Sequence, residues 1–213
     1  MKSSLCGSNS WFSYRLADVV KGQLRKHEPH ILDHITSSYP DTIASRYINM
    51  TEHLPEEERD MNLQVLNSLV DDTPSDEINM HVRAHDVIDS YKNGKYIYNF
   101  TWCRFQPDQL VTEHVVNHLL QNEFKTVNIF CARHHELDQQ TELSQQLIDD
   151  CVDVLEQHDI NSTFVDEPDP DVAFTRLCNS HVMIGTQLGY SHLACNMVKH
   201  RKRVVFDLTG LKQ

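Results

Sequence analysis

From about residue 78 to the end of the chain, short apolar runs typical of strands alternate with segments whose apolar residues recur at helical spacing. In one such segment, Leu143, Leu147 and Leu155 would share one face of a helix. This alternation predicts βα units around a mostly parallel sheet, an α/β fold of the Rossmann type. The strand candidates are Ile78–Arg83, Lys95–Phe100, Thr126–Ala132, Ser162–Val165, His181–Ile184 and Arg203–Phe206, and the helix candidates are Asp108–Gln121, Glu142–Gln157, Pro170–Asn179 and Tyr190–His200.

The first third of the chain has a different pattern. A helix is predicted from about Ser10 to Arg25, residues 28–54 are irregular, and a second helix starts at Pro55, where proline and the acids after it favour a helix N-terminus. The polar loop Asp71–Asp76 follows. We therefore predict a small N-terminal domain over residues 1–75 and a Rossmann-like domain over residues 76–213.

The composition limits the classes of partner and compartment. Of the 213 residues, 39% are hydrophobic, and the net charge is -12, which argues against nucleic acid or an acidic membrane as a general partner. No apolar run is long enough to span a bilayer, and residues 1–6 lack a secretory signal pattern. The six cysteines form no CxxC pair, so we expect reduced thiols. These features predict a cytoplasmic protein with no transmembrane segment.

The first strand candidate ends in the polar segment His81-Val82-Arg83-Ala84-His85-Asp86. An arginine at a strand end suits a phosphate, because its planar fork presents five donors and is always charged. The neighbouring histidines and Asp86 would orient that fork. The alternative interpretation is a strand end with solvated polar residues.

A second candidate site follows the strand predicted at His181–Ile184. There, Gly185-Thr186-Gln187-Leu188-Gly189-Tyr190-Ser191 forms a turn into a helix, an arrangement that points backbone N–H groups and a helix dipole at an anion. The turn lacks the Lys-Ser/Thr of a P-loop and the GxGxxG of a dinucleotide fold. The alternative is a plain βα turn.

The fourteen histidines do not predict a metal site. His114 and His118 are four residues apart, as are His30 and His34, but no segment brings a third ligand to either pair. His85-Asp86 is similar to the dyad of HD-type phosphohydrolases, whose helical context differs from the strand predicted here.

The motifs occur in an order that resembles the GT-B-type fucosyltransferase superfamily, which contains α1,2-, α1,6- and protein O-fucosyltransferases. The N-terminal turn of that family reads G-x-G-N-Q-L-F-x-Y, and the segment from Ser8 to Tyr14 keeps its Asn, Phe and Tyr. The central signature of the family is H-x-R-R-x-D. Residues 81–86 keep the His, the first Arg and the Asp, with Ala84 in place of the second Arg.

Two later segments extend the resemblance over most of residues 78–206. The run Val127–Ala132 is similar to a strand of the "IFSDD" kind. The segment from Asp171 through Ala194 is similar to the family's last unit, a helix and strand followed by a Ser/Thr-rich turn into a helix.

The resemblance implies a GT-B-like glycosyltransferase whose reduced N-terminal domain faces the acceptor. It would be metal-independent and inverting, and would transfer fucose or another sugar from a nucleoside-diphosphate sugar to a glycan or glycoprotein, with no further cofactor. The implied catalytic residues are His81, Arg83 and Asp86; the nucleotide-sugar-binding residues are Asn9, Arg83, Gly185, Thr186, Ser191 and His192; and Tyr14 and His53 lie on the acceptor side.

The general base that an inverting transfer requires is not identified by the sequence, and Asp33, His34, His53 and Asp86 are its candidates. Two other functions stay open. One is a metal-dependent, HD-like phosphohydrolase that uses His81, His85 and Asp86. The other is a nucleotide- or glycan-binding module without catalysis. The replacement of the family's second Arg by Ala84 keeps this option open.

Overall fold

A computed structural model describes most of the chain beyond residue 72. The predicted N-terminal helices and almost all of the predicted 1–75 domain lie outside the described residues. The described residues are 67, 73–84, 87–99, 104–131, 138–167, 170–186 and 190–208.

The centre of the fold is a five-stranded parallel sheet with the order β5-β4-β1-β6-β7. Met80 in the middle of β1 pairs with Ile129 of β4 on one side and with Ile184 of β6 on the other. Every residue of β1 and β6 is buried, as expected for strands covered on both faces. The strands are β1 (Ile78–His81), β4 (Thr126–Phe130), β5 (Asn161–Val165), β6 (Val182–Gly185) and β7 (Val204–Asp207).

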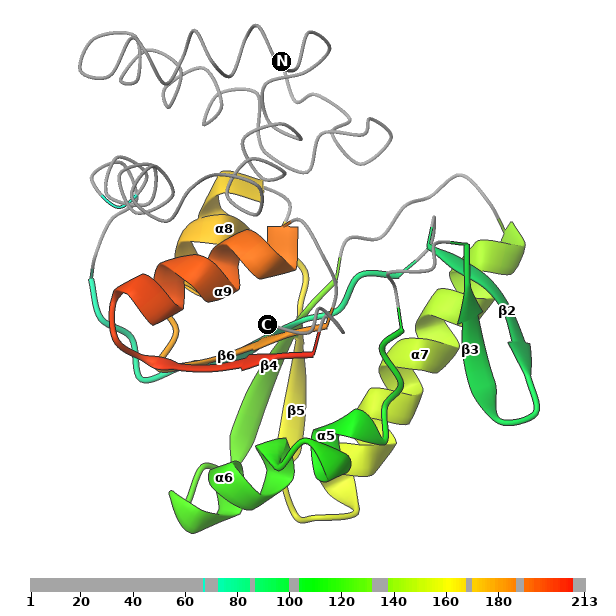
Figure 1. The fold of residues 1–213 in the computed structure, drawn as a ribbon, viewed down its shortest axis with the longest axis horizontal. Coiled ribbons are helices and arrows are strands. Elements are labelled where there is room, and N and C mark those ends of the chain that lie inside the picture. Colours follow the sequence, from blue (N-terminus) through cyan, green and yellow to red (C-terminus); the bar gives the residue numbers. More distant parts are fainter. Residues whose placement is uncertain are drawn as a thin grey trace, which may run out of the picture.

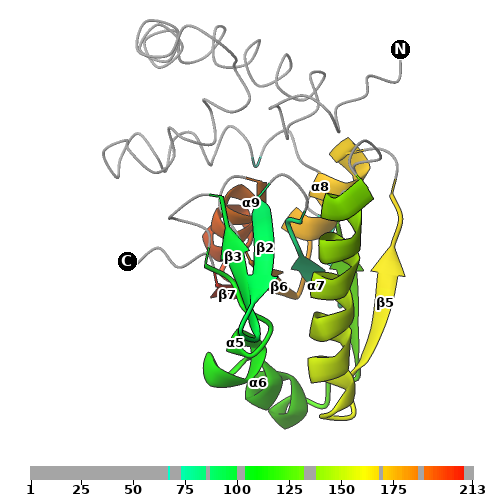
Figure 2. The same cartoon turned by 90° about the vertical axis from the view of Figure 1, so that its right-hand side faces the viewer.

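Helices cover both faces of this sheet, which gives three layers. In Figure 1, α8 and α9 lie above the sheet, α5 and α6 lie below it, and α7 runs along its lower right side; Figure 2 shows α7 beside β5 from a second direction. In α7, Leu147, Cys151 and Leu155 are fully buried at intervals of four residues, so the helix packs one apolar face. The helices are α5 (Gln109–Thr112), α6 (Val115–Gln121), α7 (Asp138–Glu156), α8 (Pro170–Cys178) and α9 (Tyr190–His200).

The prediction of an α/β fold with a mostly parallel sheet is confirmed, and two details of the prediction are wrong. The run that begins at Lys95 forms a strand as predicted, but this strand is not part of the parallel sheet: β3 (Lys95–Tyr98) pairs antiparallel with β2 (Ile88–Lys92) in a separate two-stranded hairpin. Its two-residue turn, Asn93-Gly94, has positive φ at both positions, as a type I′ turn requires.

The second wrong detail is the single helix expected over Asp108–Gln121, which is divided into α5 and α6. His114 adopts a left-handed conformation with φ 63°, so the helical path is interrupted between Thr112 and Val115. This backbone conformation is uncommon outside glycine, and neither the apolar spacing nor the composition of the segment indicates it.

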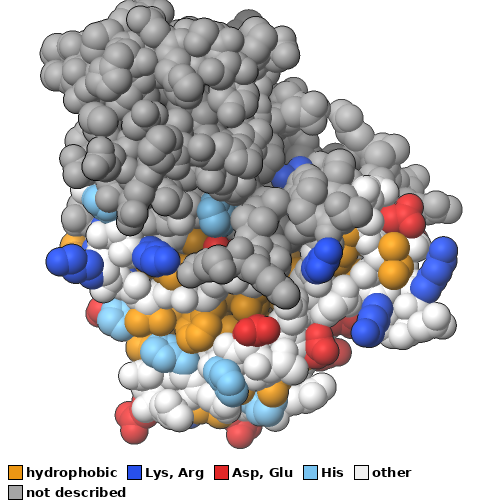
Figure 3. All heavy atoms as spheres, in the orientation of Figure 1, with side chains coloured by type: hydrophobic (Ala, Val, Ile, Leu, Met, Phe, Trp, Pro, Cys, Tyr) orange, Lys and Arg blue, Asp and Glu red, His pale blue; other side chains and the backbone are white. Residues whose placement is uncertain are grey.

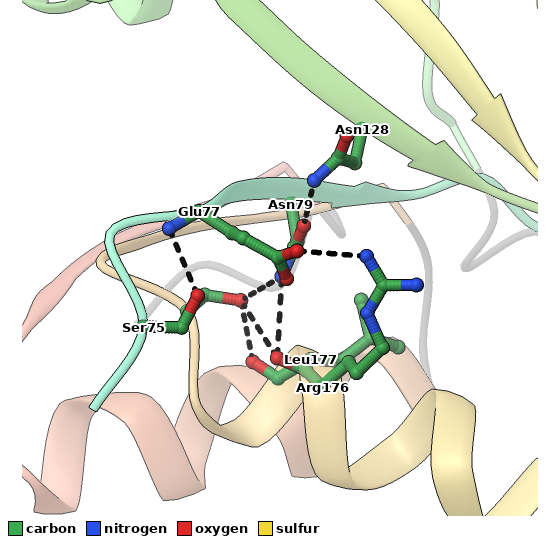
Figure 4. A network of polar contacts seen from close by, with 7 residues as sticks. Ser75, Glu77, Asn79, Asn128, Arg176 and Leu177 are labelled. Atoms are coloured by element: carbon green, nitrogen blue, oxygen red, sulfur yellow. Dashed lines mark hydrogen bonds and ion pairs between the residues drawn. The ribbon is translucent and has the colours of Figure 1, made fainter. Parts of the chain in front are cut away.

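A buried polar network joins β1 to α8 and β4 (Figure 4). The Asn79 side chain is fully buried; its Nδ2 donates to Ser180 Oγ at 2.9 Å and to the Arg176 carbonyl at 3.2 Å, and its Oδ1 accepts from Asn128 Nδ2 at 3.0 Å. Arg176 forms an ion pair with Glu77 at 2.8 Å. These bonds satisfy the polar groups at the start of β1. We therefore assign this cluster a structural role, in which it joins the sheet to α8.

Among the described helices, none combines the length and the apolar character needed to cross a bilayer.

Candidate functional site

The order of the strands places a topological switch point between β1 and β6. From β1 the chain moves to β4 and then to β5 on one side, and after α8 it returns to β6 on the other side of β1. In open α/β sheets, ligands bind outside the carboxyl ends of the strands at such a point. Here the carboxyl ends are His81 for β1 and Gly185 for β6, which pair directly in the sheet.

A short hydrogen bond connects the two sides of this point. His81 Nδ1 and Ser191 Oγ, in the first turn of α9, lie 2.5 Å apart, and both side chains are buried. Burial, with a further contribution from the Arg83 charge, lowers the pKa of His81 to about 3. The imidazole is therefore neutral at physiological pH, and it positions the start of α9 against the end of β1.

Thr186 makes a second connection between the same strands. Its Oγ1 donates to the His81 carbonyl at 3.0 Å and its backbone N–H donates to the same oxygen at 3.3 Å. Thr186 is fully buried. The residue thus extends the pairing of β6 with β1 beyond the last strand residue.

Gly185 allows α9 to approach the end of β6 closely. A Cβ atom at this position would lie 2.5 Å from the Cys195 Sγ and 3.4 Å from the Ser191 Cβ. Real side chains do not reach such a short distance, and Cys195 is 2% exposed, so its sulfur has little room to move. The glycine is required here by space, since its backbone φ is not in the left-handed region.

We expect Gly185→Ala to destabilise the fold by about 1–3 kcal/mol, the usual range for an overpacked core. Cys195→Ala removes the clashing sulfur, so the double variant should be more stable than the sum of the two single losses by about 1 kcal/mol or more. Chemical denaturation of the four proteins measures this coupling. Additive losses would show that the Cys195 sulfur does not limit the space at Gly185.

Arg83 lies two residues beyond the end of β1 and is half-buried. Its Nη1 atom is buried and has no hydrogen-bond acceptor among the residues that the structure describes, while the side chain takes part in other interactions. Ala84, next in the chain, is 3% exposed and belongs to the main hydrophobic core. The position that departs from the H-x-R-R-x-D pattern therefore faces the core in this protein.

A His–Asp pair lies at the neighbouring strand end. His192 in the first turn of α9 and Asp207, the last residue of β7, are joined by a 3.0 Å contact between Nδ1 and Oδ2. Asp207 pairs with Gly185, so the dyad lies one strand away from the switch point. Sequence reasoning missed Asp207, although an acid directly after the apolar run Val204–Phe206 indicates a polar strand end.

The structure thus brings together five of the residues predicted for the site at the ends of β1 and β6: His81, Arg83, Gly185, Thr186 and Ser191, with His192 beside them. Their roles toward a ligand remain predictions. The other predicted site residues, Asn9, Tyr14, His53 and Asp86, and the further base and dyad candidates Asp33, His34 and His85, lie outside the described residues.

Two surface cavities in the described part of the chain lie elsewhere. One of about 350 Å³ is lined by His114, Asn117, His118, Gln121 and Phe206, near the apolar side chains and histidines gathered around α6 in Figure 3. The other, of about 450 Å³, lies at the amino ends of β1 and β4, where Glu77, Ile78, Lys125 and Thr126 are among its lining residues. The second cavity is therefore at the opposite end of the sheet from the switch point.

Within the described ranges, no three His, Cys, Asp or Glu side chains are grouped as a metal site would need. The four described cysteines, Cys131, Cys151, Cys178 and Cys195, are free thiols. Burial raises the pKa of the Cys195 thiol well above its usual value, with a smaller contribution from Asp207. This thiol is consequently a packing residue and not a nucleophile.

The sequence matches no protein-family model and no curated protein. Among solved structures it is similar to POFUT1: a complex with GDP aligns over 89% of this chain and 60% of that chain, with 12% identity and a TM-score of 0.40. A POFUT1 complex with GDP-fucose aligns over 87% of this chain and 57% of that chain, with 14% identity and a TM-score of 0.38. This chain thus spans about half the length of these structures. Because these TM-scores and identities are low, the fold class is assigned from the parallel sheet of this chain and not from these alignments.

Proposed function

We propose that the carboxyl ends of β1 and β6 bind a nucleoside-diphosphate sugar, and that the protein transfers the sugar to a glycan or glycoprotein acceptor. The observation that carries this proposal is the position of two anion-binding elements at one switch point. Arg83 follows β1, and the N-terminus of the 11-residue helix α9 follows β6. The bond between His81 and Ser191 holds these two elements together.

The first turn of a helix presents backbone N–H groups that have no partner within the helix, and its dipole favours an anion. In α9 these are the N–H groups of residues 190–193. We assign the diphosphate to these groups and to the guanidinium of Arg83, which suits phosphate oxygens geometrically. The sequence resemblance at residues 81–86 and 185–191 supports the same assignment.

In the proposed reaction, the bond between the anomeric carbon and the diphosphate oxygen breaks, and negative charge develops on the leaving group. Arg83 and the helix N-terminus would stabilise this charge more strongly in the transition state than in the ground state. Fixed donors can supply this stabilisation without a metal ion, so we propose a metal-independent transfer. The donor sugar, the acceptor and the acceptor-side roles of residues 1–75 remain predictions.

A second candidate is a module that binds the nucleotide without turnover. The burial of Ala84 favours it, because the core leaves no room at this position for the second arginine of the resembled pattern. Under this alternative, the protein binds the nucleotide sugar and leaves it intact.

Calorimetric titration with a panel of GDP- and UDP-sugars, with and without EDTA, tests the proposal. GDP-fucose is the first compound to include, because one of the similar POFUT1 structures is a complex with it. We expect saturable binding of one donor that EDTA leaves unchanged, followed by slow release of the nucleoside diphosphate. If no nucleotide sugar binds, the proposed function is wrong, and binding that EDTA abolishes contradicts metal independence.

A further inference from the structure

The cavity of about 350 Å³ beside α6 combines polar side chains with an aromatic ring. Asn117, His118 and Gln121 lie three, four and seven residues after His114, so these four lining side chains share one face of the helix and its N-cap. The fifth lining residue is Phe206 in the edge strand β7, whose ring meets that of His118 edge-to-face with 5.3 Å between centroids. Small-molecule sites typically have volumes of about 300–1,000 Å³, so this cavity is large enough for a small ligand.

This cavity is separate from the proposed nucleotide site. Successive side chains of a strand point to opposite faces of a sheet. In β7, Asp207 contacts His192 of α9, so Phe206, the residue before it, faces α6 on the other side. The apolar and histidine side chains of this face gather in the lower part of Figure 3. A ligand in the cavity would therefore contact the α6 face of the sheet and not the start of α9.

The fold holds the walls of the cavity in place. Val115 and Leu119, on the inner side of α6, are fully buried in the main core. The Phe206 ring packs against the same core, and the His118 ring contacts both Phe206 and Phe124, with 5.3 and 6.3 Å between centroids. A ligand would thus meet an aromatic surface that is already ordered, which reduces the entropy cost of binding.

The chemistry of the lining favours a neutral ligand that is rich in hydroxyl groups. Among the described residues that line the cavity there is no lysine, arginine, aspartate or glutamate, so it offers no fixed charge to a phosphate or a metal cation. The side-chain amides of Asn117 and Gln121 can both donate and accept hydrogen bonds, as sugar hydroxyls do. The C–H face of a sugar ring is apolar and can be buried against the Phe206 ring.

We propose that this cavity binds one sugar residue of a neutral glycan, at a site apart from the ends of β1 and β6. Asn117 and Gln121 would hold its hydroxyl groups, and Phe206 would contact its apolar face. This inference goes beyond the proposed function, because it concerns a second binding site that requires neither the nucleotide nor the transfer reaction.

Saturation-transfer difference NMR of the full chain with the methyl glycosides of fucose, mannose, galactose and N-acetylglucosamine tests the proposal. The measurements compare wild type, Gln121→Ala, Phe206→Leu and Arg83→Ala. The matched control is Gln145→Ala, the same substitution as Gln121→Ala at an exposed position of α7. Titration with the glycoside that gives the strongest signal measures Kd. Thermal unfolding and the affinity for a nucleoside diphosphate are measured for every variant.

We expect wild type to bind at least one of these glycosides with a Kd on the order of 1 mM, as a few neutral hydrogen bonds in an open site would give. Gln121→Ala removes an amide and should raise this Kd ~3–10-fold. Phe206→Leu keeps an apolar side chain but removes the ring, and it should raise the Kd by a similar factor. Arg83→Ala and Gln145→Ala should bind the glycoside like wild type, and Gln121→Ala should leave the affinity for the nucleoside diphosphate unchanged.

Three outcomes overturn this inference. They are a wild type that binds none of the glycosides, glycoside binding that Gln121→Ala and folded Phe206→Leu leave unchanged, and glycoside binding that Arg83→Ala abolishes, since the sugar would then occupy the nucleotide site. Gln121 is exposed, so its variant decides the question even where Phe206→Leu lowers thermal stability. Failure of wild type to bind any nucleotide sugar is a separate result, which overturns the proposed function and leaves the glycoside test intact.

Discussion

Replacing Arg83 with alanine is expected to lower the affinity for a nucleoside diphosphate ~100-fold or more and to lower turnover ~10²–10³-fold. Each charge-assisted hydrogen bond contributes about 1.5–3 kcal/mol, so a bidentate contact to the diphosphate accounts for the affinity loss. The loss of one preorganised donor to the leaving group accounts for the loss in rate. Titration calorimetry measures the first effect and release of the nucleoside diphosphate measures the second.

Two variants make this result specific. Arg83→Lys keeps the charge but not the planar fork, so we expect it to recover only part of the affinity. Arg104→Ala removes an exposed arginine from the loop before α5 and should bind like wild type. Unchanged affinity in a folded Arg83→Ala protein would contradict the assignment of the diphosphate to this side chain.

We expect the second large effect from Ala84→Arg, the substitution that completes the H-x-R-R-x-D pattern. Ala84 is 3% exposed and packs within the main core, so the new guanidinium would be buried among apolar side chains. An unpaired buried charge destabilises a protein strongly, and we expect a loss of about 3–5 kcal/mol. Chemical denaturation gives the free energy of unfolding.

Ile97→Arg is the matched control, because Ile97 is 43% exposed on β3 and can present the new charge to water. It should change stability by less than about 1 kcal/mol. If Ala84→Arg is instead as stable as wild type and increases sugar transfer, the side chain at this position reaches the ligand site. The packing of residue 84 described above would then be wrong.

The parallel sheet was predictable because most of its strands contain short apolar runs, such as Val182–Ile184 in β6 and Val204–Phe206 in β7, and such runs are visible in the sequence. The predicted start of β4 at Thr126 is identical to the observed one, and the helix Tyr190–His200 is identical at both ends. The predicted strand Ile78–Arg83 is longer than β1, although Val82 continues the contact with β4 through a bond of its N–H to the Phe130 carbonyl.

Features set by backbone conformation were less predictable. The hairpin of β2 and β3 was missed even though Asn93-Gly94 is a strong turn sequence, because Ile88–Lys92 is too polar to read as a strand. The break at His114 has no counterpart in the apolar pattern of α5 and α6.

For the site, strand ends and the glycine turn could be read from the sequence because both are local patterns. The contacts that these residues make could not be predicted from the sequence, because the contacts depend on the register of the sheet. The contact of His81 with Ser191 joins β1 to α9, and the contact of His192 with Asp207 joins α9 to β7, so both form only when the sheet and α9 are assembled. The environment that separates the two histidines is therefore a property of the fold.

The location of the bound nucleotide tests the central claim most directly. Hydrogen–deuterium exchange of the full chain, with and without a saturating nucleoside-diphosphate sugar, reports it amide by amide. We predict slower exchange at residues 82–84 and 190–193, after β1 and in the first turn of α9. Slower exchange confined to residues 76–78 and 123–128, which line the cavity at the amino ends of the strands, would place the ligand at the wrong end of the sheet and contradict this account.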